Sequence, residues 1–224
     1  MKTVAFVPIK LNSERLTAKN IRPFTNGKPL IHYILKTLLT VDGLDSIYVY
    51  CSSPEIVDYL PAGVTFLQRD PYYDLSTTSF NEVLSSFAQL IDADAYVLAH
   101  ATAPFVAKSS IESGMAALRS GEHDSALAVH KIQEFLWQDG RPMNYDVENI
   151  PRTQDLKPVF VETCGLYVYT RDLILNQKRR IGSSPYLVEV SKFEATDINV
   201  EEDFILADAL YQTLFKQQFE AEQA

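Results

Sequence analysis

The sequence predicts an α/β fold with a doubly wound, mostly parallel sheet, and three observations support this. Short apolar runs alternate with helical patterns along most of the 224 residues. The run over 95–99 is almost continuously apolar, as expected of a central strand covered on both faces. The length suits one domain, so we expect residues 1–224 to form a single unit.

Elements of the first half follow from the spacing of apolar residues. Short apolar runs predict strands over 4–7, 46–51, 64–67 and 95–99. Apolar residues at three-to-four spacing predict helices over 30–39 and 80–91, the second after a segment rich in capping hydroxyls. A further helix should run to Arg119, with a capping box from Ser109 to Glu112 at its start and Gly121 at its end.

The second half repeats the alternation after an interruption. Strands are expected over 125–130, 159–169 and 186–190, with helices near 171–177 and 200–219. Between residues 133 and 156 the pattern changes to turn chemistry, with Asp139-Gly140 predicting a hairpin. We interpret this segment as an excursion from the main sheet.

A cationic loop follows the first strand and is the first candidate site. Residues 1–28 carry a net charge of +5 on a chain whose net charge is −9. In open α/β sheets, ligands bind at the carboxyl ends of strands. The residues Lys10, Arg15 and Lys19 therefore suggest a small anionic ligand, whereas most of the surface would repel nucleic acid. The alternative is that these are ordinary solvated surface charges.

Three further loops place polar residues at the expected strand ends. Arg69 follows the third strand, His100 the central strand, and Asp197 with Asn199 the late strand. Asp197 and Asn199 lie on the same side of an extended segment, which suits Mg²⁺. Asn199 could instead cap the helix that begins at residue 200. His100 could contact a substrate, act as a base, or be a plain strand-end histidine.

Known phosphate-binding motifs and membrane signals are missing from the sequence. Neither Gly-x-Gly-x-x-Gly nor Walker A occurs, so phosphates would be bound by Lys10, Arg15, Lys19 and loop amides. We expect Cys51 and Cys164 to be free thiols. The amino end does not resemble a signal peptide and no apolar stretch is long enough to span a membrane, so we expect a cytoplasmic protein without membrane contact.

Several segments together resemble the acylneuraminate cytidylyltransferases, the family that also includes the CMP-Kdo synthetases. The resemblance rests on 8–20, on Arg69 with 75–79, on 98–105, on 151–156 and on 197–203, in the family's order and spacing. It implies a Rossmann-like nucleotidyltransferase fold. It also implies transfer of CMP from CTP to the anomeric hydroxyl of a 2-keto sugar acid, with Mg²⁺ and release of pyrophosphate.

The resemblance also implies roles for individual residues. Lys10, Lys19 and Asp197 would be catalytic, and Asp197 and Asn199 would bind the metal. His100, Arg152 and Gln154 would bind the sugar acid, Arg152 through its carboxylate. Residues 133–156 resemble the family's dimerisation region, which implies a homodimer. The nucleotide-binding set would be Lys10, Asn12, Ser13, Arg15, Lys19, Asn20, Arg69 and Ser76.

Departures from the family pattern leave other functions open. Cys164 stands where asparagine is usual, Ser76 near a common aspartate, and Asn199 in place of the second metal carboxylate. One alternative is a nucleotidyltransferase for another nucleotide, or for a sugar without a carboxylate. The other is a weakened relative that binds a nucleotide sugar as an interaction module. Phe135 and Trp137 could line the sugar pocket or contribute to a dimer contact.

Overall fold

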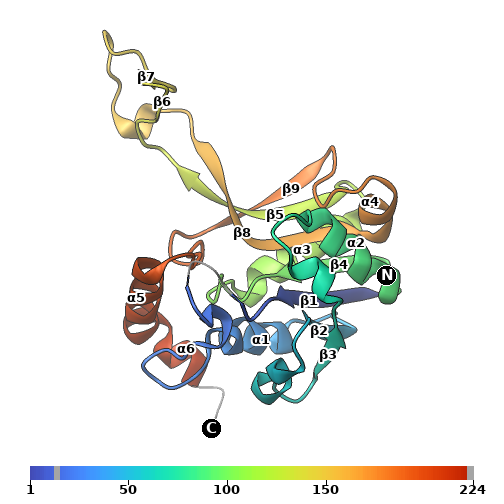
Figure 1. Ribbon diagram of the computed structural model, residues 1–224. Coiled ribbons are helices and arrows are strands. Elements are labelled where there is room, and N and C mark those ends of the chain that lie inside the picture. The colour runs from blue at the N-terminus through green and yellow to red at the C-terminus, as the bar shows by residue number, and fades with distance from the viewer. Residues whose placement is uncertain (13–15, 221–224) are drawn as a thin grey trace.

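The computed structural model describes residues 1–12 and 16–220, and a seven-stranded sheet forms the centre of this part (Figure 1). Its strands are β1 (Thr3–Ile9), β2 (Ser46–Cys51), β3 (Val64–Gln68), β4 (Ala95–Ala99), β5 (Ser125–Ile132), β8 (Val159–Thr170) and β9 (Pro185–Val190). Their order is β3-β2-β1-β4-β8-β5-β9. Only β8 runs antiparallel to its neighbours among these strands, so the predicted mostly parallel sheet is confirmed.

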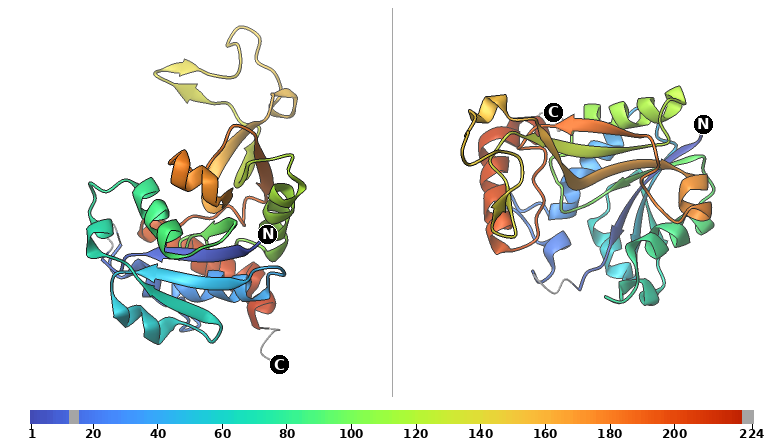
Figure 2. Two further views of the ribbon diagram at one scale, coloured as in Figure 1. Left: turned by 90° about the vertical axis from the view of Figure 1, so that its right-hand side faces the viewer. Right: turned by 90° about the horizontal axis from the view of Figure 1, so that it is seen from above.

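Helices cover both faces of the sheet, as the doubly wound prediction requires (Figure 2). On one face, α1 (Leu30–Thr40) and α3 (Lys108–Ser120) pack Ile34 and Met115 against Ala5 and Val97. On the other, α2 (Phe80–Leu90) and α4 (Arg171–Asn176) share a second core with β1 and β4. In that core the rings of Phe6 and Phe87 stack with centroids 3.9 Å apart. Burial on both faces explains the continuous apolar run of β4.

The strand order reverses between β1 and β4. From β1 the chain adds β2 and β3 on one side, and β4 pairs with β1 on the other side. In an open α/β sheet, ligands bind in the crevice at this reversal, outside the carboxyl ends of the strands. The loop after β1, which contains Lys10 and Lys19, and the loop that begins at His100 therefore border the crevice where a ligand is expected.

Two helix starts illustrate where capping patterns succeed and fail. At α2, Ser79 accepts a hydrogen bond from the backbone of Glu82 and Glu82 accepts one from Ser79, a complete capping box. The capping box expected at α3 is wrong, because that helix begins at Lys108 and makes no side-chain cap. Its Glu112 instead accepts a hydrogen bond from the backbone of Asp42. The left-handed Gly121 ends α3 as predicted.

Residues 133–156 extend away from the sheet (Figures 1 and 2). The predicted hairpin is present as β6 (Trp137–Gln138) and β7 (Arg141–Pro142). Asp139 and Gly140 join the two strands with φ angles of 50° and 74°, the signature of a tight hairpin turn. A short 3₁₀ turn, Thr153–Asp155, precedes the return to β8.

The C-terminal helix predicted over 200–219 is divided into three parts. These are α5 (Glu201–Leu210), a π-helical segment (Tyr211–Phe215) and α6 (Lys216–Glu220). The helix changes register where Tyr211 is buried against Phe24 and Tyr33. The Asn26 side chain donates to the Tyr211 hydroxyl at 2.7 Å and accepts from Tyr33 at 2.8 Å. The C-terminal helix therefore packs against the segment that follows the cationic loop.

Candidate active site

Lys19 and the loop that contains Asp197 meet directly. The Lys19 ammonium donates a hydrogen bond to the backbone oxygen of Ile198 at 2.7 Å, and the Lys19 residue is only 9% exposed. The two residues are 179 positions apart in the sequence. A hydrogen bond to this carbonyl fixes the position of the ammonium. The junction thus places a fixed positive charge one residue away from the Asp197 carboxylate.

The other two candidate loops join the same edge of the sheet. The backbone nitrogen of Ile198 donates to the oxygen of Thr102 at 2.9 Å, which connects the Asp197 loop to the loop after β4. Arg69, which follows β3, donates from Nη2 to the backbone oxygen of Ile9 at the end of β1 at 2.7 Å. The expected convergence of the four strand-end loops is therefore present.

Arg69 is a buried cation with a local partner. It is 4% exposed, and its Nη2 forms an ion pair with Asp74. Its guanidinium carbon lies 5.7 Å from the centre of the Tyr50 ring. Its Nε is buried without a hydrogen-bond partner among the described residues. Because a buried unpaired donor is costly, this nitrogen is available to a ligand acceptor.

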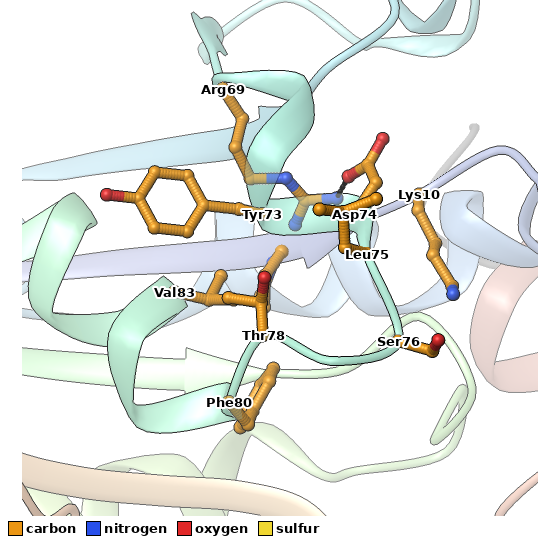
Figure 3. A pocket seen from close by; sticks show the side chains of 10 residues that line it. Lys10, Arg69, Tyr73, Asp74, Leu75, Ser76, Thr78, Phe80 and Val83 are labelled. Atoms are coloured by element: carbon orange, nitrogen blue, oxygen red, sulfur yellow. Dashed lines mark hydrogen bonds and ion pairs between the residues drawn. The ribbon is translucent and has the colours of Figure 1, made fainter.

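A pocket of about 290 Å³ lies beside Arg69 (Figure 3). Lys10 and Ser76 lie toward one end of it and Tyr73 toward the other. The volume is at the lower end of the range for small-molecule sites. Its lining combines two cationic side chains, a carboxylate, hydroxyls and aromatic rings. The lining residues are Pro8, Lys10, Arg69, Tyr73, Asp74, Leu75, Ser76, Thr78, Phe80 and Val83.

Asp197 and Asn199 lie together, as their spacing predicts. The Asn199 side-chain amide donates to the Asp197 carboxylate at 2.6 Å. The capping role considered for Asn199 is wrong, because Val200 is the N-cap and α5 has no side-chain cap from it. Asp203 instead accepts from the backbone nitrogens of Asn199 and Val200, at 2.8 and 3.0 Å. This leaves the Asn199 side chain to orient Asp197.

This pair offers a sparse set of metal donors. No group of three or more His, Cys, Asp or Glu side chains suited to a metal occurs in residues 1–12 and 16–220. The available donors are the Asp197 carboxylate and the Asn199 amide oxygen. Mg²⁺ commonly binds through one or two carboxylates together with substrate phosphates. The donor set therefore fits an ion that arrives with a nucleotide, and not a closed protein cage.

His100 lies at the end of β4 and is electrically neutral near pH 7. Its pKa is lowered to about 4, chiefly by burial and in addition by the positive charges of Arg180 and Lys19, whereas the negative charge of Asp197 acts to raise the pKa. Its Nε2 is buried and has no hydrogen-bond partner among the described residues. A neutral imidazole with a low pKa is a weak base near pH 7, so the geometry favours a hydrogen bond to a substrate over proton abstraction.

The remaining predicted residues are dispersed. Asn20 is 9% exposed and donates from its side chain to the backbone oxygen of Lys10 at 3.1 Å, which stabilises the loop. Asn12 is exposed, and Ser13 and Arg15 lie outside the described residues. Within the excursion, Gln154 is exposed and Arg152 forms a two-pronged ion pair with Asp155. The structure does not bring Arg152 or Gln154 into contact with the Lys19 junction within one chain.

Some side chains of this region are absent from the sequence-based site. Tyr73, Thr78 and Phe80 line the pocket, although sequence periodicity assigns Phe80 to the helix core. Asp74 pairs with Arg69 five residues earlier, a spacing that could have indicated the ion pair. Arg180 acts electrostatically on His100 from a segment 80 residues later, and no local signal in the sequence indicates this proximity.

The sequence was compared with known protein families to identify the class of protein that has this site. The family model described as Cytidylyltransferase matches residues 4–217, nearly the whole chain. The chain belongs to the cytidylyltransferase family. This agrees with the resemblance carried by the motifs, and the match includes both loops that meet at Lys19 and Ile198.

The individual relatives share low sequence identity with this chain. An N-acylneuraminate cytidylyltransferase of Oncorhynchus mykiss is 24% identical over 91% of this chain and 49% of its own length. An 8-amino-3,8-dideoxy-manno-octulosonate cytidylyltransferase of Shewanella woodyi is 24% identical over 93% of this chain and 98% of its own. The chain thus spans about half the length of the first relative and nearly all of the second.

A solved structure supports the fold. It is a CMP:2-keto-3-deoxy-manno-octonic acid synthetase complexed with CTP, with a TM-score of 0.70. The match covers 95% of this chain and 99% of that chain at 16% sequence identity. At this identity the similarity establishes a shared nucleotidyltransferase architecture and leaves residue roles to the geometry above.

Proposed function

We propose that this chain transfers CMP from CTP to the anomeric hydroxyl of a 2-keto sugar acid, with Mg²⁺, and releases pyrophosphate. The observation that carries the proposal is the contact of Lys19 with Ile198, which brings the cationic loop and the Asp197 loop to one edge of the sheet in a cytidylyltransferase family member. The names of the relatives supply the acceptor class, a 2-keto sugar acid.

The proposed reaction requires positioning and charge stabilisation. The sugar hydroxyl oxygen bonds to the α-phosphorus, the bond from this phosphorus to the bridging oxygen of pyrophosphate breaks, and the hydroxyl proton passes to solvent water. Lys10 and Lys19 would neutralise phosphate charge, which is worth most where the donors are fixed in advance. Lys19 is fixed by Ile198, and Lys10 lines the pocket beside Arg69.

Metal binding in this proposal is assigned to Asp197 and Asn199. When bound with the nucleotide, Mg²⁺ would supply charge neutralisation on the phosphates. Asn199 orients the Asp197 carboxylate through their 2.6 Å hydrogen bond. Exchange of Asp197 for Asn should raise the Mg²⁺ concentration needed for half-maximal activity by about tenfold or more, since it removes the only carboxylate of the pair. Glu202→Gln, an exposed neighbour, serves as the control.

Assembly and location are further parts of the proposal. The excursion exposes large apolar side chains, which suits a homodimer because monomers rarely expose such patches. These side chains are Trp137, Met143, Val147 and Ile150. No helix of the described chain is long and apolar enough to cross a membrane. We place the reaction in the cytoplasm, where CTP is available to it.

Pyrophosphate release from CTP and Mg²⁺ tests the proposal. The acceptor panel is N-acetylneuraminic acid, deaminated sialic acid, Kdo, legionaminic acid and pseudaminic acid. At least one acid should give CMP-sugar and pyrophosphate in equal amounts. Release with UTP or with a neutral sugar alone would instead support a different nucleotidyltransferase.

A catalytically weakened nucleotide-sugar binder is the second candidate. It is favoured by Asn199, which donates its amide to Asp197 where the resemblance leads one to expect a second carboxylate. Such a protein would bind CTP in calorimetry yet release no pyrophosphate with any acid. Exchange of Asn199 for Asp would then be expected to raise Mg²⁺ affinity.

A further inference from the structure

Asp74 lines the candidate pocket but has no role in the proposal so far. It ends a short 3₁₀ turn, Pro71–Asp74, and its carboxylate forms an ion pair with Arg69 and accepts a hydrogen bond from the Ser52 hydroxyl. Arg69 follows β3, Ser52 follows β2, and Arg69 Nη2 also donates to the backbone oxygen of Ile9 at the end of β1. The Asp74 carboxylate is therefore positioned by groups from three strand ends before any ligand binds.

The ion pair leaves its side of the pocket electrically neutral, whereas Lys10 adds a positive charge at one end of the pocket (Figure 3). Phosphate groups bind to cations through charge-assisted hydrogen bonds. A nucleoside triphosphate in this pocket should therefore place its phosphates toward Lys10. The uncharged base then belongs beside Arg69 and Asp74, where the carboxylate would repel a phosphate.

The Asp74 carboxylate has acceptor capacity that the fold does not use. An ionised carboxylate offers about four acceptor sites. Two hydrogen bonds reach it from the described residues, one to each oxygen, from Arg69 and from Ser52. Its side chain is 28% exposed, compared with 4% for that of Arg69. A ligand in the pocket can therefore donate a further hydrogen bond to Asp74.

Arg69 provides a donor next to this acceptor. Its Nη2 is occupied by Ile9 and Asp74. Its Nε and Nη1 have no hydrogen-bond partner within residues 1–12 and 16–220, and of these two nitrogens Nε is fully buried and Nη1 is not. Nη1 is thus a single donor that a ligand in the pocket can reach. The ion pair presents one acceptor and one donor side by side.

Cytosine carries the complementary groups on its edge. Its 4-amino group is a donor, and its N3 and O2 are acceptors, whereas uracil has the acceptor O4 in place of the amine. Proteins recognise cytosine through an Asp or Glu carboxylate that accepts from this amine. The hydroxyls of Ser76 and Thr78 in the same pocket can donate or accept, so they do not distinguish the two bases. Among the described residues that line the pocket, Asp74 alone has a carboxylate.

We propose that Asp74 selects cytosine by accepting a hydrogen bond from its 4-amino group, an inference that rests on CTP as the nucleotide of the proposed function. Arg69 Nη1 donates to a ring acceptor on the same edge of the base. Uracil would instead place its O4 oxygen against the carboxylate, and two acceptors repel each other. Lys10 and Lys19 bind the phosphates of any nucleoside triphosphate, so Asp74 adds the choice of base.

The test compares Asp74→Asn with Asp58→Asn, which removes the same charge from an exposed position outside the pocket. The full-length proteins are titrated with three nucleotides by calorimetry in the presence of Mg²⁺. These are CTP, UTP and the triphosphate of pyrimidin-2-one riboside, which lacks the 4-amino group. Wild type should bind CTP about tenfold to a hundredfold more tightly than the pyrimidin-2-one nucleotide, the range for a hydrogen bond to a charged group. Asp58→Asn should match wild type.

Asp74→Asn should lose most of this preference. Its affinity for CTP should fall by about tenfold to a hundredfold, while that for the pyrimidin-2-one nucleotide stays within about threefold of wild type. UTP should bind Asp74→Asn relatively better, because the amide nitrogen of Asn can donate to O4.

Two comparisons can overturn the assignment of Asp74. Equal losses for CTP and the pyrimidin-2-one nucleotide in Asp74→Asn would show a purely structural role. Equal binding of these two nucleotides by wild type would overturn the assignment even where the variant does not fold, and so would the absence of CTP binding. A preference for CTP without pyrophosphate release on any acid would contradict the proposed function and support the role of Asp74.

Discussion

The edge of the central sheet and the excursion over 133–156 present their polar and apolar groups in opposite ways. At the sheet edge, Lys19 and Asn20 are 9% exposed and Arg69 is 4% exposed, and each is hydrogen-bonded to another loop or strand end. In the excursion, the Arg152 side chain is 72% exposed and Ile150 is 62% exposed. The sheet edge of the candidate site is thus assembled within one chain, whereas the excursion exposes apolar and charged side chains to solvent.

The strongest test of the sheet-edge region is removal of its central cation. Lys19→Ala should reduce CMP transfer by at least about 10²-fold, the range for losing one preorganised electrostatic donor. The measurement is kcat/KM for pyrophosphate release. Lys28→Ala is the matched control, because Lys28 belongs to the same cationic segment but is exposed. Wild-type turnover by Lys19→Ala would show that the sheet edge is not the reaction centre.

The second prediction uses the buried histidine of the same region. Because the pKa of His100 is lowered from 6.5 to about 4, the unfolded chain binds a proton at this residue between pH 6.5 and 4 while the native chain does not. Above pH 6.5, protonation of His100 therefore does not affect the free energy of unfolding. As the pH falls from 6.5 toward 4, this residue lowers the free energy of unfolding by roughly 3 kcal/mol at most.

Exchange of His100 for Gln should flatten this part of the stability profile. Urea unfolding at several pH values measures it, with the partly exposed His123→Gln as control. An unchanged slope between pH 6.5 and 4 would mean that His100 titrates like an exposed histidine.

The third prediction addresses the excursion. Ile150→Asp should weaken self-association by about tenfold to a hundredfold, as expected for loss of one large apolar contact at an interface. Sedimentation of the protein over a range of concentrations measures it. The affinity for CTP should not change, because the excursion that contains Ile150 extends away from the central sheet (Figure 1). Glu148→Gln is the control, and a protein that is monomeric throughout would contradict the interface proposed for this surface.

The smallest expected effect concerns an exposed ion pair between Arg22 and Glu201, near the sheet edge. Arg22 donates two hydrogen bonds to Glu201, at 2.5 and 2.7 Å. Arg22 is three residues after Lys19, and Glu201 is three residues after Ile198. The hydrogen bond to Glu201 raises the pKa of Arg22 and lowers that of Glu201. Exposed ion pairs contribute little, so Arg22→Ala should raise the KM for CTP by less than about fivefold. A larger increase in KM would show that the Arg22–Glu201 ion pair determines the position of Lys19.

Local signals explain which parts of the fold follow from the sequence. The strand Ser46–Cys51 and the hairpin at Asp139-Gly140 are predicted with their observed limits, because a short apolar run and a left-handed turn are determined by neighbouring residues. The cap at Ser109 is wrong because α3 begins at Lys108 and has no side-chain cap, and the cap at Asn199 is wrong because Asp203 accepts from the backbone at that helix start. A capping pattern identifies candidates but not which one the tertiary structure uses.

Long-range proximity explains what the sequence leaves open at the site. The convergence of Lys19 and Asp197 follows from the rule that ligands bind at strand ends, so it is predictable once the strands are identified. The contact of Arg180 with the ring of Phe80 joins residues 100 positions apart, and Phe80 carries no motif. The homodimer proposed for the excursion depends on a surface that no pattern within the chain defines.

The most direct test of the account is a double-mutant cycle between Lys19→Ala and Asp197→Asn, read as the affinity for CTP in the presence of Mg²⁺. If both side chains act on one bound triphosphate, the two changes should be non-additive, with a coupling energy of about 1 kcal/mol or more. If the two effects add to within about 0.5 kcal/mol, Lys19 and Asp197 act independently, and the claim that both act on one bound triphosphate is contradicted.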